Sequence, residues 1–127
     1  MNYYELESKL KELKIEDYIW LIYIGIIILS WYSNNLERKY FINNDIKSKE
    51  KYRQTLIIIF SILIIVYLYF LNSSFNDYKN LNINDTEKKK RLTTLSLIGS
   101  LLIAVSGFIF LYIAIKDEDI DIELAFN

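Results

Sequence analysis

The side chains with the most regular spacing in this chain are small and uncharged, and their chemistry is hydrogen bonding and close packing. Ser96, Ser100, Ala104 and Gly107 recur at steps of four, four and three residues, which places them on one face of a helix. In lipid, such residues let helix backbones approach closely, and Ser hydroxyl groups can bond across the contact. The spacing predicts a helix-packing face here.

Two glycines complete this predicted packing set. Gly99 widens the face, and Gly25, in an earlier apolar stretch, is where we expect the helix that carries the face to come close. The face can pack against other helices of the same chain, or against a second copy or another protein. The sequence leaves both alternatives open.

Charged side chains and the residues that most often bind metals are missing from the apolar parts of the chain. There is no His and no Cys, which removes haem ligation, thiol redox chemistry and nearly all zinc and copper sites. Residues 18–33, 55–71 and 92–115 carry no charged side chain, whereas a proton or ion carrier should carry at least one. No phosphate loop, nucleophile elbow or HExxH motif occurs. We therefore expect no catalytic residue, no cofactor, no metal and no enzymatic activity.

The same three apolar stretches are the elements that must position the small residues. A bilayer core takes about 20 helical residues to cross, with a range of about 17 to 25. Residues 55–71 and 92–115 fall within this range, and residues 18–33 are slightly short. A water-soluble core is the alternative, but too little polar sequence remains to cover three such stretches. We predict an all-α fold, a three-helix transmembrane bundle that runs up, down and up.

The first 17 residues have a pattern of their own. Tyr3, Leu6, Leu10 and Leu13 recur at steps of three and four, with charged residues between them. This periodicity predicts a short amphipathic interfacial helix in residues 1–17 that precedes the bundle. The segment mixes acidic and basic residues, unlike the basic start of a cleaved signal peptide, so we expect the first span to be retained.

The connecting segments contain helix start signals. Asp45 follows two asparagines and can cap a helix that opens at Ile46, and the sequence DTE at 85–87 provides a second cap. Both helices should therefore begin before the membrane does. Residues 116–127 form an acidic C-terminal tail, which lacks the glycine and the spacing of a calcium loop.

Aromatic residues flank the first apolar stretch. Tyr18 and Trp20 lie near its start, and Trp31 and Tyr32 near its end. Such rings prefer the head-group level of a bilayer. They predict an interfacial belt.

A basic run precedes the third apolar stretch. If cytoplasmic, it can attract anionic lipid at about 1 kcal/mol per charge, and the alternative is a solvated helix start. Orientation stays open, because eight Lys and Arg residues fall on the predicted side of the N-terminus and seven on the other. The run consists of Lys88, Lys89, Lys90 and Arg91.

The stretch IEDYIWLIYIGIIILSWYSNNLERKYFINND, with its DYIW entry and NND turn, precedes a Tyr-rich second span and a third span rich in Gly and Ser. In this the chain resembles the small uncharacterised three-span membrane proteins of AT-rich, low-GC Gram-positive bacteria. The resemblance covers most of the chain and implies the bacterial cytoplasmic membrane, with no assigned activity. The abundance of Ile, Asn, Lys and Tyr also fits a phage or a large virus.

The remaining expectations concern role and partners. A net charge of −1 gives no field that would attract nucleic acid, so we expect none as a partner. The lipid bilayer is the expected partner, with a homo-oligomer or a larger membrane complex. A non-enzymatic structural or accessory role follows. The alternative is a holin-like pore former, suggested by size, three spans and a charged tail, although holin tails are generally basic and this one is acidic.

Overall fold

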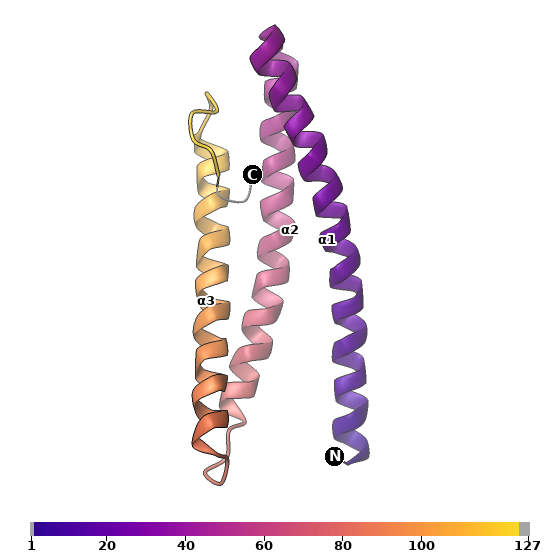
Figure 1. Cartoon of the computed structure of the whole chain (residues 1–127), viewed down its shortest axis with the longest axis vertical. Helices are drawn as coiled ribbons and strands as arrows, with labels where there is room; N and C mark the ends of the chain where they lie inside the picture. Colours follow the sequence, from indigo (N-terminus) through magenta and orange to yellow (C-terminus); the bar gives the residue numbers. More distant parts are fainter. Residues whose placement is uncertain (1, 125–127) are drawn as a thin grey trace.

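The computed structural model describes residues 2–124, which form three α-helices (Figure 1). These are α1 (Tyr3–Asn43), α2 (Ile46–Lys79) and α3 (Glu87–Lys116). Their 41, 34 and 30 residues correspond to lengths of about 60, 50 and 45 Å. Each helix is therefore longer than the roughly 30 Å hydrocarbon core of a bilayer. The all-α prediction is confirmed.

The helix starts agree with the predicted capping residues. The Asp45 carboxylate accepts a hydrogen bond from the Lys47 backbone N–H at 3.1 Å, and the Thr86 hydroxyl accepts one from the Lys89 backbone N–H at 3.1 Å. Between α1 and α2, Asn44 has φ 54° and ψ 34°, a left-handed conformation that asparagine tolerates. The chain therefore reverses direction between α1 and α2 within two residues.

The prediction of a separate, short interfacial helix in residues 1–17 is wrong. α1 runs without interruption from Tyr3 to Asn43, so residues 1–17 are the first part of one long helix. The amphipathic periodicity is present there, but no proline or glycine ends it before the apolar stretch begins. Glu, Leu and Lys dominate this part and favour helix strongly. Met1 lies outside the described residues.

Two of the described helices, α2 and α3, are long and apolar enough to cross a membrane. Their most apolar segments have mean hydropathies of 2.5 and 2.4. α1 does not reach this level, because its uncharged stretch, residues 18–33, is short and lies between charged segments.

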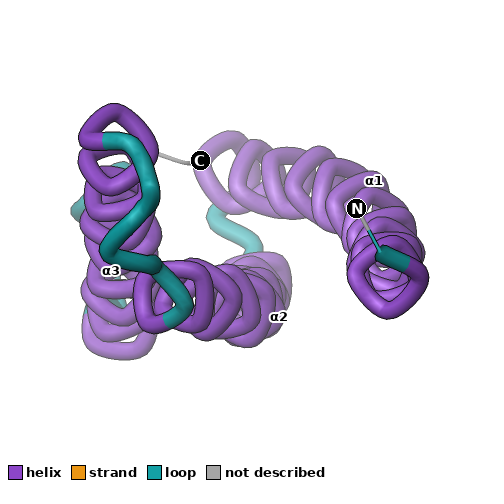
Figure 2. Tube along the Cα trace, turned by 90° about the horizontal axis from the view of Figure 1, so that it is seen from below, coloured by secondary structure: helices purple, strands orange, loops and turns teal. Residues whose placement is uncertain are grey.

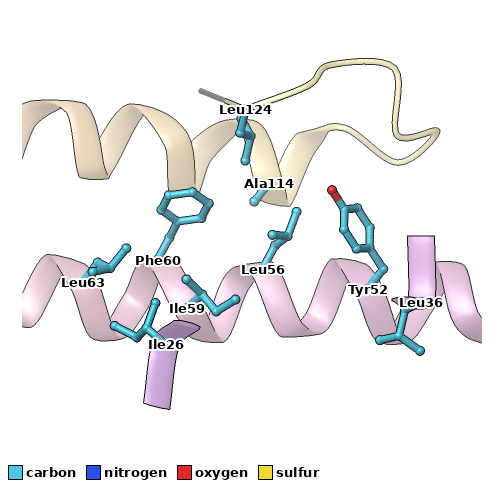
Figure 3. Close-up of a cluster of buried hydrophobic side chains, with 9 residues drawn as sticks. All are labelled: Ile26, Leu36, Tyr52, Leu56, Ile59, Phe60, Leu63, Ala114 and Leu124. Carbon is cyan, nitrogen blue, oxygen red and sulfur yellow. The ribbon is translucent and has the colours of Figure 1, made fainter. Parts of the chain in front are cut away.

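α2 is the central helix of the bundle. It packs against both α1 and α3, whereas the backbones of α1 and α3 stay apart within residues 2–124. Figures 1 and 2 show α1 against α2 and diverging from it toward the N-terminus, while the α2–α3 connection lies at the same end as that terminus. The core around α2 is drawn in Figure 3; it consists of Ile26, Leu36, Tyr52, Leu56, Ile59, Phe60, Leu63, Ala114 and Leu124.

The acidic tail folds back over the end of α3. The Asp117 carboxylate accepts hydrogen bonds from the backbone N–H groups of Asp121 at 3.0 Å and Ile122 at 2.8 Å. Ile120 adopts φ 56° in this turn. The turn returns Leu124 to the core, where it is 5% exposed. The predicted tail is thus a largely exposed turn that Leu124 anchors to the core, and its last three residues lie outside the described part.

Candidate functional site

Part of the predicted small-residue face is the contact between α3 and α2. Ala104 and Gly107 are buried there. A Cβ placed on Gly107 would lie 3.1 Å from Cδ2 of Tyr67 and 3.2 Å from Cγ1 of Ile64, both on α2. The missing side chain of Gly107 is therefore what allows the two helices their close approach. At these positions the face packs against the protein's own second helix.

A hydroxyl pair joins the same two helices further along. Oγ of Ser74 on α2 lies 2.8 Å from Oγ of Ser100 on α3. Either atom can donate, and both groups are partly buried. Ser96, one turn earlier on α3, is exposed at the side of this contact.

Two glycines of the predicted packing set are not at a close contact. A Cβ placed on Gly25 or Gly99 would meet no atom within 4 Å. The expectation that the third helix approaches Gly25 is wrong, because α1 packs against α2 and not against α3.

A cleft of about 260 Å³ opens where residues of all three helices converge. Four hydroxyl-bearing residues from α2 and α3 and one from α1 give it a polar lining within otherwise apolar stretches. We call it the hydroxyl cleft; it is lined by Tyr23, Tyr67, Phe70, Ser74, Ser96, Ser100 and Ile103.

The chemistry of the hydroxyl cleft is hydrogen bonding to an uncharged group. Hydroxyl groups donate and accept, but none of the lining residues is a carboxylate or an amine that would activate a nucleophile. The described residues include no group of three or more Asp or Glu placed to hold a metal ion. The arrangement is suited to packing and binding.

Sequence reasoning named Ser96 and Ser100 but missed Ser74, Tyr23 and Tyr67. These three residues lie in other stretches of the chain, and their spacing carries no signal that joins them to α3. A hydroxyl group within an apolar stretch is the one local hint.

The four residues of the predicted interfacial belt all lie on α1 and point away from the bundle. Tyr18, Trp20, Trp31 and Tyr32 each leave about half or more of their surface exposed. They are free of the core, so a bilayer can cover them. The belt itself stays a prediction.

The predicted basic run forms the first turns of α3. The Lys89 ammonium group lies 3.2 Å from the Asp85 carboxylate, and Lys90 lies 3.6 Å from Glu87. Asp85 also accepts from the Asn82 backbone N–H at 2.8 Å, and this bond, followed by the Lys89 contact, lowers the pKa of the Asp85 carboxyl. Lys88 and Arg91 are exposed. The run is thus partly engaged in closing the α2–α3 connection.

A second polar cluster lies at the opposite end of the bundle. Nη2 of Arg53 donates to the Ile115 carbonyl at 3.0 Å, one of the last carbonyl groups of α3. Nζ of Lys49 lies 3.5 Å from the Asp119 carboxylate and 5.3 Å from the centre of the Tyr40 ring. These contacts tie α1, α2 and the tail together.

No protein-family model, curated protein or solved structure matches this chain.

Proposed function

We propose that this chain is an integral membrane protein with three spans, at residues 18–33, 55–71 and 92–115, and that it has a non-enzymatic structural or accessory role. It would pack with a second copy of itself or with a larger membrane complex. The resemblance of its sequence to three-span proteins of low-GC Gram-positive bacteria favours the bacterial cytoplasmic membrane as its location.

The outer surface of α3 carries this proposal. In this helix of 30 residues only Ala104, Gly107 and Ala114 are buried. Ten large apolar side chains of α3 are about half exposed; they are Leu92, Leu95, Ile98, Leu101, Leu102, Ile103, Val105, Phe108, Ile109 and Ile115.

The size of this surface argues against water as its surroundings. Full burial of one such side chain is worth about 1.5–3 kcal/mol, so leaving ten of them half exposed to water forgoes on the order of 10 kcal/mol. A whole domain is typically stable by only about 5–15 kcal/mol. Lipid or a partner helix is therefore the surrounding that the α3 surface fits.

The first span is supported by the position of α1. Ile26 and Leu36 pack into the core on α2, which brings the apolar stretch of α1 alongside that of α2. Trp20 and Trp31 are separated by only about 17 Å along the helix. Local thinning of the bilayer around α1 would accommodate this short belt.

The accessory role follows from what lines the spans. The hydroxyl cleft offers hydrogen bonds to an uncharged partner group, which is how helices associate in lipid. The three apolar stretches contain no Asp, Glu, Lys, Arg or His, the residues that usually carry a charge or proton pathway through a membrane.

Expression in bacteria tests the proposal. We expect the protein to stay in the membrane pellet after carbonate washing, to need detergent for solubility, and to leave the membrane potential unchanged, with a second copy or a partner recovered by crosslinking. A polypeptide that stays monodisperse in buffer without detergent would refute the membrane location. A sharp loss of potential with lysis would instead favour the holin-like pore.

A further inference from the structure

The α2–α3 pair has a second opening, on the side that α1 does not line. It is a groove of about 490 Å³ lined by Leu68, Leu71, Asn72, Phe75, Leu97 and Leu101. Five of these six side chains are apolar. The groove lies between α2 and α3 on the part of the pair that leads to their connection, where Figure 1 shows the two helices side by side.

A more polar opening lies next to this apolar groove along both helices. The next opening, of about 470 Å³, is lined by Tyr78, Lys79, Leu81, Asn82, Ile83, Lys90 and Thr94. Tyr78 and Lys79 follow Phe75 by one turn of α2, and Thr94 and Lys90 precede Leu97 by one and two turns of α3.

A direct contact joins the two parts. Nζ of Lys79, from the polar part, lies 5.4 Å from the centre of the Phe75 ring, which lines the apolar part. The two openings therefore lie next to each other along the same two helices, and we call them together the α2–α3 groove. Its two ends differ sharply in polarity.

Measured along α3, the levels of the two ends match one leaflet of a bilayer. With Leu92 at the start of the apolar stretch, Lys90 lies about 3 Å outside it and Leu101 about 14 Å inside it, at a rise of about 1.5 Å per residue. Half of a typical hydrocarbon core is about 15 Å. The basic end therefore lies at the head-group level, and the apolar end reaches the depth of an acyl chain.

The charges at the basic end favour an anion. Lys79 and Lys90 both line it, and the Asn82 amide and the Tyr78 hydroxyl add neutral donors. Lys90 already contacts Glu87 at 3.6 Å and donates to the Ile83 carbonyl at 3.2 Å. The Glu87 side chain is 93% exposed, so water weakens that ion pair and leaves Lys90 able to bind a phosphate.

We propose that the α2–α3 groove binds an anionic phospholipid of the surrounding leaflet. Its phosphate lies between Lys79 and Lys90, and one acyl chain lies along Leu71, Phe75 and Leu97. The inference rests on the proposed membrane location. It goes further in naming one class of lipid and one site for it.

Native mass spectrometry of the full chain, released from detergent with added lipid, tests this site. We expect one phosphatidylglycerol to stay bound under conditions that remove phosphatidylcholine. Each basic residue near the membrane surface contributes about 1 kcal/mol to binding an anionic lipid, and about 1.4 kcal/mol corresponds to a tenfold change in affinity. Replacing both lysines, Lys79→Gln with Lys90→Gln, should therefore weaken phosphatidylglycerol binding about thirtyfold. The double variant Lys88→Gln with Arg91→Gln removes the same charge outside the groove and should weaken binding clearly less, because only general attraction to the anionic lipid is then lost.

A second variant tests the apolar end. Leu97→Trp fills the groove without changing charge, and we expect it to lose phosphatidylglycerol while its helical circular dichroism stays that of the wild type. The proposal would be overturned if the two lipids bind equally, or if both charge variants lose phosphatidylglycerol to the same extent. It would also be overturned if the lysine substitutions change self-association but leave lipid binding unchanged. If the proposed membrane location is wrong, the protein will be soluble without detergent, which is a separate observation.

Discussion

The α2–α3 contact at Gly107 makes the sharpest prediction about stability. In Gly107→Ala the new Cβ would lie 3.1 Å from Tyr67 and 3.2 Å from Ile64, both side-chain atoms, so these side chains must move. Overpacking of this kind costs about 1–3 kcal/mol, and the better helix propensity of alanine returns about 0.5–1 kcal/mol. The net expectation is a destabilisation of up to about 2.5 kcal/mol.

Gly99→Ala is the matched control for this change. It lies on the same helix, and its Cβ would meet no atom within 4 Å. Only the propensity difference then remains, so this variant should be more stable than the wild type by up to about 1 kcal/mol.

The measurement is unfolding of the detergent-solubilised protein by a denaturing detergent, followed by circular dichroism. The two substitutions are chemically identical, so the opposite signs isolate the contact with α2. If Gly107→Ala is stabilised as much as Gly99→Ala, the helices are not in close contact at this position and the packing described for α3 is wrong.

The other predictions concern a hydrogen bond and the helix caps. Ser74→Ala and Ser100→Ala should each cost about 0.6 kcal/mol, and up to about 1.7 kcal/mol. Because they remove the same bond, the double variant should cost little more than either alone, and additive costs in a double-mutant cycle would refute the pair. Hydrogen bonding from Ser48 lowers the pKa of Asp45, and bonding from Asn82 lowers that of Asp85. A lowered folded-state pKa adds stability above the ordinary value near 3.8 that is lost as pH falls through the folded value. Melting temperature in detergent should therefore fall below about pH 4, and Asp45→Asn with Asp85→Asn should flatten that fall; an unchanged slope would contradict it.

Local signals in the sequence were enough for much of the fold. Asp45 and Thr86 cap helices as predicted because a cap depends on the residues of a single turn. The all-α class followed from long apolar stretches without proline. The predicted boundary after residue 17 was wrong because amphipathic periodicity describes the faces of a helix and not its end.

The sequence alone also determined that His and Cys are absent and that the three apolar stretches carry no charged side chain. Only the tertiary structure decided that Gly107 and not Gly25 lies at the close contact, that Ser100 pairs with Ser74, and that Lys79 and Lys90 share one groove. The physical reason is that α3 is apolar on nearly every side. On such a helix the hydrophobic pattern marks no preferred face, so its neighbours are selected by shape and hydrogen bonding between helices that are distant in sequence.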